Sequence, residues 1–244
     1  MGRKKPGRKT SARKTPGRKT PARATPGRAP RRRGPPPPVE AMLDLLEATH
    51  PDAKLALDWE DPFQLLVATI LAAQARDDRI NLLTPELFRR WPDARAFAAA
   101  PLEVLAEALR PTGYFNQKAR AVQGASRALV ERYGGQVPAD LDALVQLPGV
   151  GRKTANVVLG VAFGQPDRVA VDTHVKRVSA RLGLTRSSDP EEIEADLERL
   201  IPAARRTRAC HLMQYHGRRL CLARKPRCDL CPLAPLCPAA GTLG

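Results

Sequence analysis

From Pro38 onward, apolar residues recur mostly at intervals of three and four positions, and no stretch longer than a few residues alternates apolar with polar side chains. The first pattern is typical of helices that bury one face, whereas alternation would indicate strands. Ten segments follow the helical pattern, including DPFQLLVATILAAQA, LDALVQL, RKTANVVLGVAF and RRTRACHLMQYHGRRLCLAR. The sequence therefore predicts an all-α protein.

Short turns that contain Pro or Gly separate these segments, as in RPTGYFN, GGQVP and LPGVG. Pro lacks the N–H donor that a helix needs, and Gly tolerates the backbone conformations that end one. Several segments begin at an Asp, whose carboxylate can cap the free N–H groups of a first helical turn. Because the connections are short, we expect one compact bundle rather than separate modules.

The first 37 residues follow no such pattern. They hold fourteen of the 41 Lys and Arg residues, none of the 25 Asp and Glu residues, and almost no large apolar side chain. The unit Pro-Gly-Arg recurs at positions 6, 16 and 26. Such a segment buries too little apolar surface to offset its chain entropy. We predict a disordered basic tail over residues 1–37.

The tail accounts for nearly all of the formal net charge of +16, because the rest of the chain carries 27 basic and 25 acidic residues. A flexible polycation binds nucleic acid by releasing counterions, without reading the sequence. The alternatives are a solubilising extension and an organelle transit peptide, although the tail lacks the large apolar residues of an amphipathic transit peptide. No run of 18 apolar residues and no signal-peptide core occurs. We therefore expect a soluble intracellular protein, cytoplasmic and nucleoid-associated if bacterial, with no membrane partner.

Four of the five cysteines gather near the C-terminus, with gaps of six, two and five residues. A secreted disulfide scaffold would spread its cysteines over a small domain, so metal binding is the better interpretation. Four thiolates suit either tetrahedral zinc or a [4Fe–4S] cluster, and the spacing does not choose between them. The fifth cysteine, Cys210, falls within an apolar helical pattern and is interpreted as a core residue. The candidate ligands are Cys221, Cys228, Cys231 and Cys237.

Three cations lie between the first two of these cysteines: Arg224, Lys225 and Arg227. A loop that a metal holds in place would present them as a rigid contact for DNA phosphates. The alternative is an ordinary solvated loop.

The stretch LPGVGRKTANVVL places a turn between two predicted helices. Gly149 and Gly151 allow positive φ and close backbone approach, and the second helix begins near Arg152. Its free N–H groups and helix dipole form an anion site sized for one phosphate. We interpret the motif as a helix-hairpin-helix that holds DNA without reading bases, although a plain turn between two helices would need no ligand. The candidate DNA contacts are Gly149, Val150, Gly151 and Arg152.

Lys153 is a candidate nucleophile. Outside the tail the chain has 22 Arg and only five Lys, and an amine can lose its proton whereas a guanidinium cannot. A helix N-terminus disfavours added positive charge, which favours the free amine. Further along, VAVDTH places Asp172 at the start of another predicted helix, where it can cap the helix and also support catalysis. His174 is a candidate for the substrate pocket, with a local hydrogen-bonding role as the alternative.

In order and spacing, LPGVGRKTANVVL, VAVDTH and C-x6-C-x2-C-x5-C closely resemble the endonuclease III family of DNA glycosylases and abasic-site lyases, from about Val39 to Pro238. The resemblance implies the helix-hairpin-helix DNA glycosylase fold with two helical domains. A six-helix barrel would span 61–167, and 38–60 with 168–238 would form an iron–sulfur domain. It also implies a [4Fe–4S] cluster rather than zinc on the four cysteines.

The resemblance further implies a monomer that acts on duplex DNA with a damaged base or an abasic site, using Lys153 and Asp172 in a cleft between the domains. The nucleotide is flipped out, the amine attacks C1′, the base leaves, and β-elimination nicks the strand. The substrates implied are oxidised pyrimidines such as thymine glycol. Gln74 would fill the vacated stack, with Asp77 nearby, and Tyr114 stands at the second wedge position, where the family often has an aliphatic residue.

Two other functions compete with this one. An adenine DNA glycosylase acting opposite oxidised guanine would share the hairpin, Asp172 and the cysteine spacing, but that branch lacks a lysine at position 153 and usually carries a further C-terminal domain. A non-catalytic, metal-stabilised DNA-binding module would explain the hairpin, the cysteines and the tail. It would leave Lys153 and Asp172 unexplained.

Overall fold

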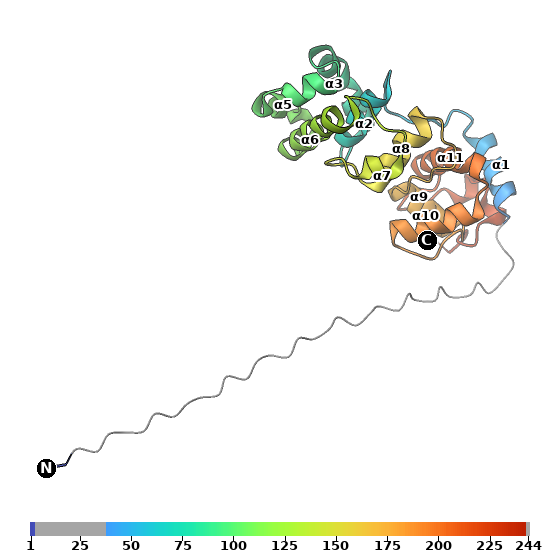
Figure 1. Cartoon of the computed structure of the whole chain (residues 1–244). Coiled ribbons are helices and arrows are strands. Elements are labelled where there is room, and N and C mark those ends of the chain that lie inside the picture. The colour runs from blue at the N-terminus through green and yellow to red at the C-terminus, as the bar shows by residue number, and fades with distance from the viewer. Residues whose placement is uncertain (3–37, 243–244) are drawn as a thin grey trace. The chain divides into compact units, whose positions relative to one another are not determined.

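A computed structural model of the chain describes residues 1–2 and 38–242 (Figure 1). Apart from its first two residues, the predicted disordered tail at 1–37 lies outside the described residues. Residues 37–244 belong to one compact unit. Within the described part of this unit the chain forms helices and turns and no strand, which confirms the all-α prediction. None of the described helices is long and apolar enough to cross a membrane.

Eleven α-helices and four short 3-10 helices make up the described structure, and their bounds are as follows. The α-helices are α1 (Val39–Thr49), α2 (Pro62–Leu71), α3 (Asp77–Arg90), α4 (Ala94–Ala99), α5 (Leu102–Ala108), α6 (Phe115–Tyr133), α7 (Leu141–Val145), α8 (Arg152–Ala162), α9 (Thr173–Arg181), α10 (Pro190–Leu200) and α11 (Arg206–Arg219). The 3-10 helices are η1 (Arg110–Thr112), η2 (Ala203–Arg205), η3 (Cys228–Leu230) and η4 (Ala234–Leu236).

Aspartates cap five of these helices, as the sequence led us to expect. In each case the carboxylate accepts a hydrogen bond from a backbone N–H two or three residues further on, and such a cap stabilises a helix by about 1 kcal/mol. The capping residues of α2, α4, α7, α9 and α10 are Asp61, Asp93, Asp140, Asp172 and Asp189.

Two predicted helices end early, and one helix was not predicted. The apolar run after α2 predicts a helix to Ala75, but α2 ends at Leu71 and a turn follows. Likewise α11 ends at Arg219, because the N–H groups of Leu220 and Cys221 both return to the His216 carbonyl and turn the chain into the cysteine loop. Six-residue α4 is too short to show a helical period.

Two buried apolar clusters organise the fold. The first is centred on α2, which packs against α3, α6 and α8, and it includes Phe97, which meets Phe63 edge to face with ring centroids 5.6 Å apart. The second cluster joins α1 to α9, α10 and α11, and Figure 1 shows blue α1 beside red α11. Segments from both ends of the described chain therefore share one core.

Cys210 belongs to the second cluster and is 2% exposed. Burial raises the pKa of its thiol to about 12. The structure thus confirms that Cys210 is a core residue, and it does not line the cavity that the four loop cysteines share.

Candidate active site and cysteine loop

The hairpin turn joins α7 to α8 and depends on Gly149. Its φ is +75°, and a Cβ built on it would lie 2.5 Å from the Cβ of Ala121 in α6. The turn is closed by a 3.1 Å hydrogen bond from the Val150 N–H to the Leu147 carbonyl. Both the backbone angle and the close approach to α6 exclude any side chain at position 149.

Gly151 has a different role from Gly149. It precedes α8 with φ −89°, which any residue adopts, and a Cβ there would meet no atom within 4 Å. No side chain caps α8, so the N–H groups of its first turn keep the hydrogen-bonding capacity that an anion could use. A phosphate can therefore approach the start of α8 and accept hydrogen bonds from these N–H groups.

Val150 is placed differently from the other turn residues. Its side chain is 5% exposed and packs in the first cluster, and its N–H already donates within the turn. Both groups hold the turn in shape. The DNA contact of Val150 stays a prediction.

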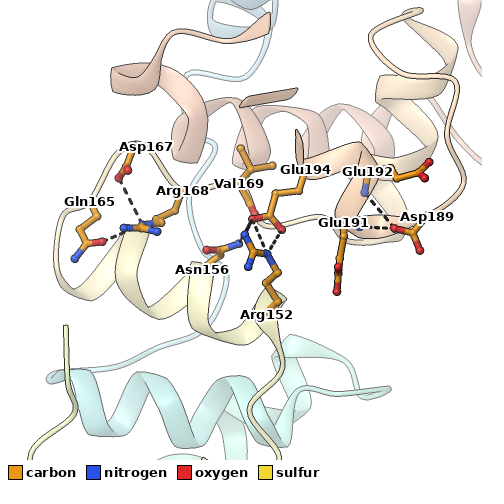
Figure 2. Close-up of polar contacts among 10 residues, drawn as sticks. All are labelled: Arg152, Asn156, Gln165, Asp167, Arg168, Val169, Asp189, Glu191, Glu192 and Glu194. Carbon is orange, nitrogen blue, oxygen red and sulfur yellow. Dashed lines mark hydrogen bonds and ion pairs between the residues drawn. The ribbon is translucent and has the colours of Figure 1, made fainter. Parts of the chain in front are cut away.

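Arg152 faces a carboxylate rather than open solvent alone. Its Nε lies 3.0 and 2.9 Å from the two carboxylate oxygens of Glu194 in α10, and a terminal nitrogen lies 2.9 Å from one of them (Figure 2). The Glu194 side chain is 8% exposed, against 47% for that of Arg152. The guanidinium therefore neutralises a buried carboxylate, and its positive charge is already matched before DNA binds.

Asn156 completes this network, as Figure 2 shows. Its Nδ2 donates to Glu194 Oε1 at 3.1 Å and to the Val169 carbonyl at 2.8 Å, and the residue is 2% exposed. The first contact ties α8, whose first turn carries Lys153, to α10, and the second ties it to the segment that leads into Asp172. Sequence reasoning missed Glu194 and Asn156. The signal that could have found them is a polar residue on the apolar face of an amphipathic helix.

Lys153 and Asp172 both stand at helix starts. Lys153 is exposed in the first turn of α8. Asp172 is half-buried and caps α9 through one oxygen, since Oδ1 accepts from the N–H groups of His174 at 2.9 Å and Val175 at 2.7 Å. Among the described residues no hydrogen bond reaches Oδ2. Capping therefore leaves one carboxylate oxygen for chemistry.

His174 contacts Arg177, which in turn bonds to the first residue of the cysteine loop. Its Nδ1 lies 3.1 Å from a terminal nitrogen of Arg177, which also donates to the Gly217 carbonyl at 2.9 Å. The Arg177 Nε donates to the Cys221 carbonyl at 3.1 Å. Burial, more than its charged neighbours, lowers the pKa of His174. One ring nitrogen is thus engaged within the protein, and the pocket role of His174 stays a prediction.

Three non-glycine residues of the described chain have positive φ, and sequence reasoning had selected all three as DNA contacts. They are Gln74 at 54°, Tyr114 at 48° and Lys225 at 51°. Side chains in this region cost about 1 kcal/mol or more, and such strain gathers at functional sites. Gln74 and Lys225 are exposed, and Tyr114 is a 65% exposed aromatic residue.

The turn that carries Tyr114 is held from two sides. The buried Lys118 amine donates to the Thr112 carbonyl at 2.8 Å, and burial lowers the pKa of that amine. Arg79 of α3 donates to the Pro111 carbonyl at 3.1 Å. Since α3 begins three residues after Gln74, the bond from Arg79 connects the segment of Gln74 to the turn of Tyr114.

Asp77, in the first turn of α3, is paired with Arg218 of α11 across 2.9 Å. The pairing removes some of the repulsion that a free carboxylate would exert on DNA phosphates. Asp77 lies three residues after the wedge candidate Gln74, so its ion pair connects the segment of Gln74 to α11. A direct contact of Asp77 with DNA stays a prediction.

The four loop cysteines line one small cavity, which apolar residues such as Val178 and Leu182 also line. None of them forms a disulfide. A zinc ion requires four sulfurs at about 2.3 Å from one point, whereas a multi-iron cluster fills a cavity between them. The donor set and the cavity fit a cluster.

The cations between the first two cysteines are exposed, and none is in an ion pair with a described residue. The loop that bears Arg224, Lys225 and Arg227 is closed by a 3.0 Å bond from the Arg227 N–H to the Leu220 carbonyl. The charges of this loop are therefore available to DNA phosphates, in contrast to the charge of Arg152.

Two side chains that sequence reasoning missed reach loop sulfurs. Arg181 places a terminal nitrogen 3.3 Å from Cys221 Sγ, and His216 places Nε2 3.5 Å from Cys231 Sγ. Burial lowers the pKa of His216 to about 4. The signal in the sequence is weak, because both residues lie in helices outside the cysteine motif.

Comparison with known proteins matches two family models. Residues 67–203 match the HhH-GPD superfamily of base excision DNA repair proteins, and residues 221–237 match the iron-sulfur binding domain of endonuclease III. The second match begins and ends at the outer cysteines of the loop. Its description agrees with the cavity, and the cofactor is a [4Fe–4S] cluster.

Curated relatives and solved structures agree with these models. The chain is 51% identical over 199 residues to endonuclease III of Synechocystis, covering 82% of this chain and 91% of that protein. Identity to endonuclease III of Bacillus subtilis is 44% over 200 residues, covering 82% and 91%. A trapped covalent intermediate of endonuclease III with DNA superposes with a TM-score of 0.80 at 42% identity, covering 84% of this chain and 96% of that one.

Proposed function

This chain belongs to the endonuclease III family of helix-hairpin-helix base excision DNA repair proteins, and from that premise we propose that it is a bifunctional DNA glycosylase and abasic-site lyase. It is a DNA-binding enzyme of the glycosylase class. The finer proposal is that it acts as a monomer on duplex DNA, removes oxidised pyrimidines such as thymine glycol, and nicks the strand by β-elimination.

One observation carries the proposal: an exposed amine and a carboxylate with a free oxygen stand at the starts of α8 and α9. The hydrogen bond from Asn156 of α8 to the Val169 carbonyl joins α8 to the segment that leads into α9. With the nucleotide flipped out of the duplex, the free amine of Lys153 attacks C1′ and the base leaves with the bonding electrons. The Asp172 carboxylate stabilises the positive charge that develops on the sugar. Opening of the sugar ring yields a Schiff base on Lys153.

The lyase step follows from that Schiff base. Loss of a proton from C2′ lets electrons flow toward the iminium, and the 3′ phosphate leaves in a β-elimination that breaks the strand. Water then hydrolyses the remaining Schiff base and frees Lys153. Asp172 Oδ2 is positioned at a helix start, where it can accept or return protons during these steps.

DNA contacts are proposed on three surfaces. The uncapped start of α8 would bind a backbone phosphate beside Gly151, and the exposed cations of the cysteine loop would bind others. Gln74 and Tyr114, both in strained backbone conformations, would fill the gap that the flipped nucleotide leaves. A tyrosine there can stack on a base, where an aliphatic side chain only fills space.

The [4Fe–4S] cluster would be held by the four loop cysteines, and when bound it supplies a rigid anchor for that loop. We propose that residues 61–167 form the domain with the hairpin and that residues 38–60 and 168–238 form the iron–sulfur domain. The two apolar clusters support this division except at residues 55–59, where Leu55, Leu57 and Trp59 pack with the first cluster. Iron analysis tests the ligands: Cys231→Ala should lose iron and the yellow-brown colour, while Cys210→Ala should keep both. Full iron in Cys231→Ala would contradict the ligand assignment.

Borohydride trapping tests the catalytic proposal. Duplexes that contain thymine glycol, an abasic site, or adenine opposite 8-oxoguanine are incubated with native protein and with Lys153→Gln. We expect covalent adducts on the first two duplexes with native protein and none with Lys153→Gln. Base release without trapping would favour the monofunctional adenine glycosylase, and binding without either reaction would leave only a DNA-binding module.

A further inference from the structure

Two buried histidines lie in line with one cysteine of the loop. His50 follows the last residue of α1, His216 lies in α11, and each is 2% exposed. His50 Nε2 lies 3.2 Å from His216 Nδ1, and His216 Nε2 lies 3.5 Å from Cys231 Sγ. The rings meet edge to face with centroids 5.4 Å apart. Neither histidine has a part in the proposed reaction.

The row of hydrogen bonds ends at His50. Nδ1 of His50 is a buried polar atom without a hydrogen-bond partner in the described structure. A neutral imidazole has one N–H donor and one acceptor nitrogen, so the two hydrogen bonds, His50 to His216 and His216 to Cys231, must run in the same direction. Which direction is present depends on the proton of Cys231.

Cluster ligation decides that direction. A cysteine sulfur bound to iron has lost its proton and can only accept, so His216 Nε2 must carry the proton and donate to it. His216 Nδ1 is then the acceptor, and His50 Nε2 must donate to it. The unpartnered Nδ1 of His50 is left as a bare acceptor. In protein without the cluster, a Cys231 thiol could donate instead, and both rings would reverse.

We propose that His216 donates a hydrogen bond to the cluster-bound sulfur of Cys231, and that His50 holds His216 in the tautomer that can donate. A hydrogen bond to a cluster sulfur stabilises the more reduced, more negative cluster, so the pair raises the reduction potential of the cluster. His50 acts only through His216, as a positioning residue. The inference rests on the ligand assignment of Cys231 proposed above, which the iron analysis of Cys231→Ala tests separately.

The test is protein-film voltammetry of the full chain loaded with its cluster, comparing native protein with His216→Leu and His50→Leu. Leucine is close to histidine in volume and removes every N–H donor. We expect His216→Leu to shift the midpoint potential to a more negative value. His50→Leu should shift it in the same direction by a smaller amount, because His216 keeps its ring but loses the partner that fixes its tautomer.

His211→Leu is the matched control. His211 lies in the same helix, and burial lowers its pKa to about 4 as it does for His216, but it contacts no loop sulfur. Its potential should equal that of native protein. Equal potentials in native protein, His216→Leu and His50→Leu, each with full iron content, would overturn the proposal, and so would an equal shift in His211→Leu. Should His216→Leu fail to retain iron, His50→Leu decides the matter, since His50 touches no cluster ligand.

Discussion

The hairpin turn and the cysteine loop offer DNA similar chemistry but are held in different ways. In the hairpin, positive φ belongs to a glycine, Gly149, and the nearby charge of Arg152 is matched by buried Glu194. In the cysteine loop, positive φ belongs to Lys225, and the exposed cations have no acidic partner among the described residues. The hairpin is neutralised and sterically defined by its contacts with α10 and α6, whereas the cysteine loop is charged and strained.

The two regions therefore differ in the interactions that stabilise them. The hairpin is stabilised by packing against α6 and α10, so its shape is present before DNA binds. In the loop, the cations and Lys225 itself are exposed, while Arg177 and Arg181 bond the carbonyls of Cys221 and the residue after it. We expect ligation of the four thiolates to supply the rest of the free energy that holds Lys225 in its strained conformation. Four variants, ordered from the largest expected effect to the smallest, test this contrast.

Gly149→Ala should produce the largest loss of stability. Its Cβ would lie 2.5 Å from the Ala121 Cβ at a φ of +75°, and strain with overpacking costs about 3 kcal/mol. The measurement is urea denaturation of the cluster-loaded protein. Gly151→Ala is the control, since its Cβ meets no atom within 4 Å. It should change stability by less than about 1 kcal/mol but weaken DNA binding. Equal stability losses would contradict the separate roles of the glycines.

Arg152→Gln should cost about 2 kcal/mol, because it leaves the buried Glu194 carboxylate without its partner. The value is below that of a fully buried pair because the Arg152 side chain is 47% exposed. Denaturation of Arg152→Gln, Glu194→Gln and the double variant measures the coupling. The double variant should recover part of the loss, and strictly additive losses would show that the two side chains are not coupled.

Arg227→Gln should affect DNA binding rather than stability. An unpaired cation that contacts a phosphate contributes about one counterion, so the slope of log K against log salt should fall by about one. Arg152→Gln serves as the comparison, because its charge is already matched by Glu194, and we expect its slope to stay near that of native protein. A larger slope change in Arg152→Gln than in Arg227→Gln would reverse the contrast between the regions.

Lys225→Gly should give the smallest effect, and a favourable one. Glycine adopts the φ of 51° without steric cost, so the cluster-loaded protein should gain about 0.5–1 kcal/mol over Lys225→Gln, which removes the same charge. Thermal unfolding of the two variants, side by side, measures the difference. A less stable Lys225→Gly would mean that the lysine conformation is not strained.

Local patterns predicted much of this molecule. Apolar residues at three and four residue spacing identify most helices, because burial of one face is a local requirement, and Asp172 was predicted as a cap because capping involves residues within one turn. The turn after α2 was missed, since an apolar run cannot show that Gln74 leaves the helix. The sequence could not show that the charge of Arg152 is matched, because its partner Glu194 lies 42 residues away in the chain.

The sequence by itself determined the helical fold, the hairpin with its glycines, and a cysteine set whose spacing allows a metal, because each depends on residues close together in the chain. Tertiary structure alone decided which charges are matched and which are exposed. It placed Glu194 against Arg152, Asn156 between α8 and the segment before Asp172, and His50 and His216 in line with Cys231. Such pairings depend on how distant helices pack, and no local pattern encodes that packing.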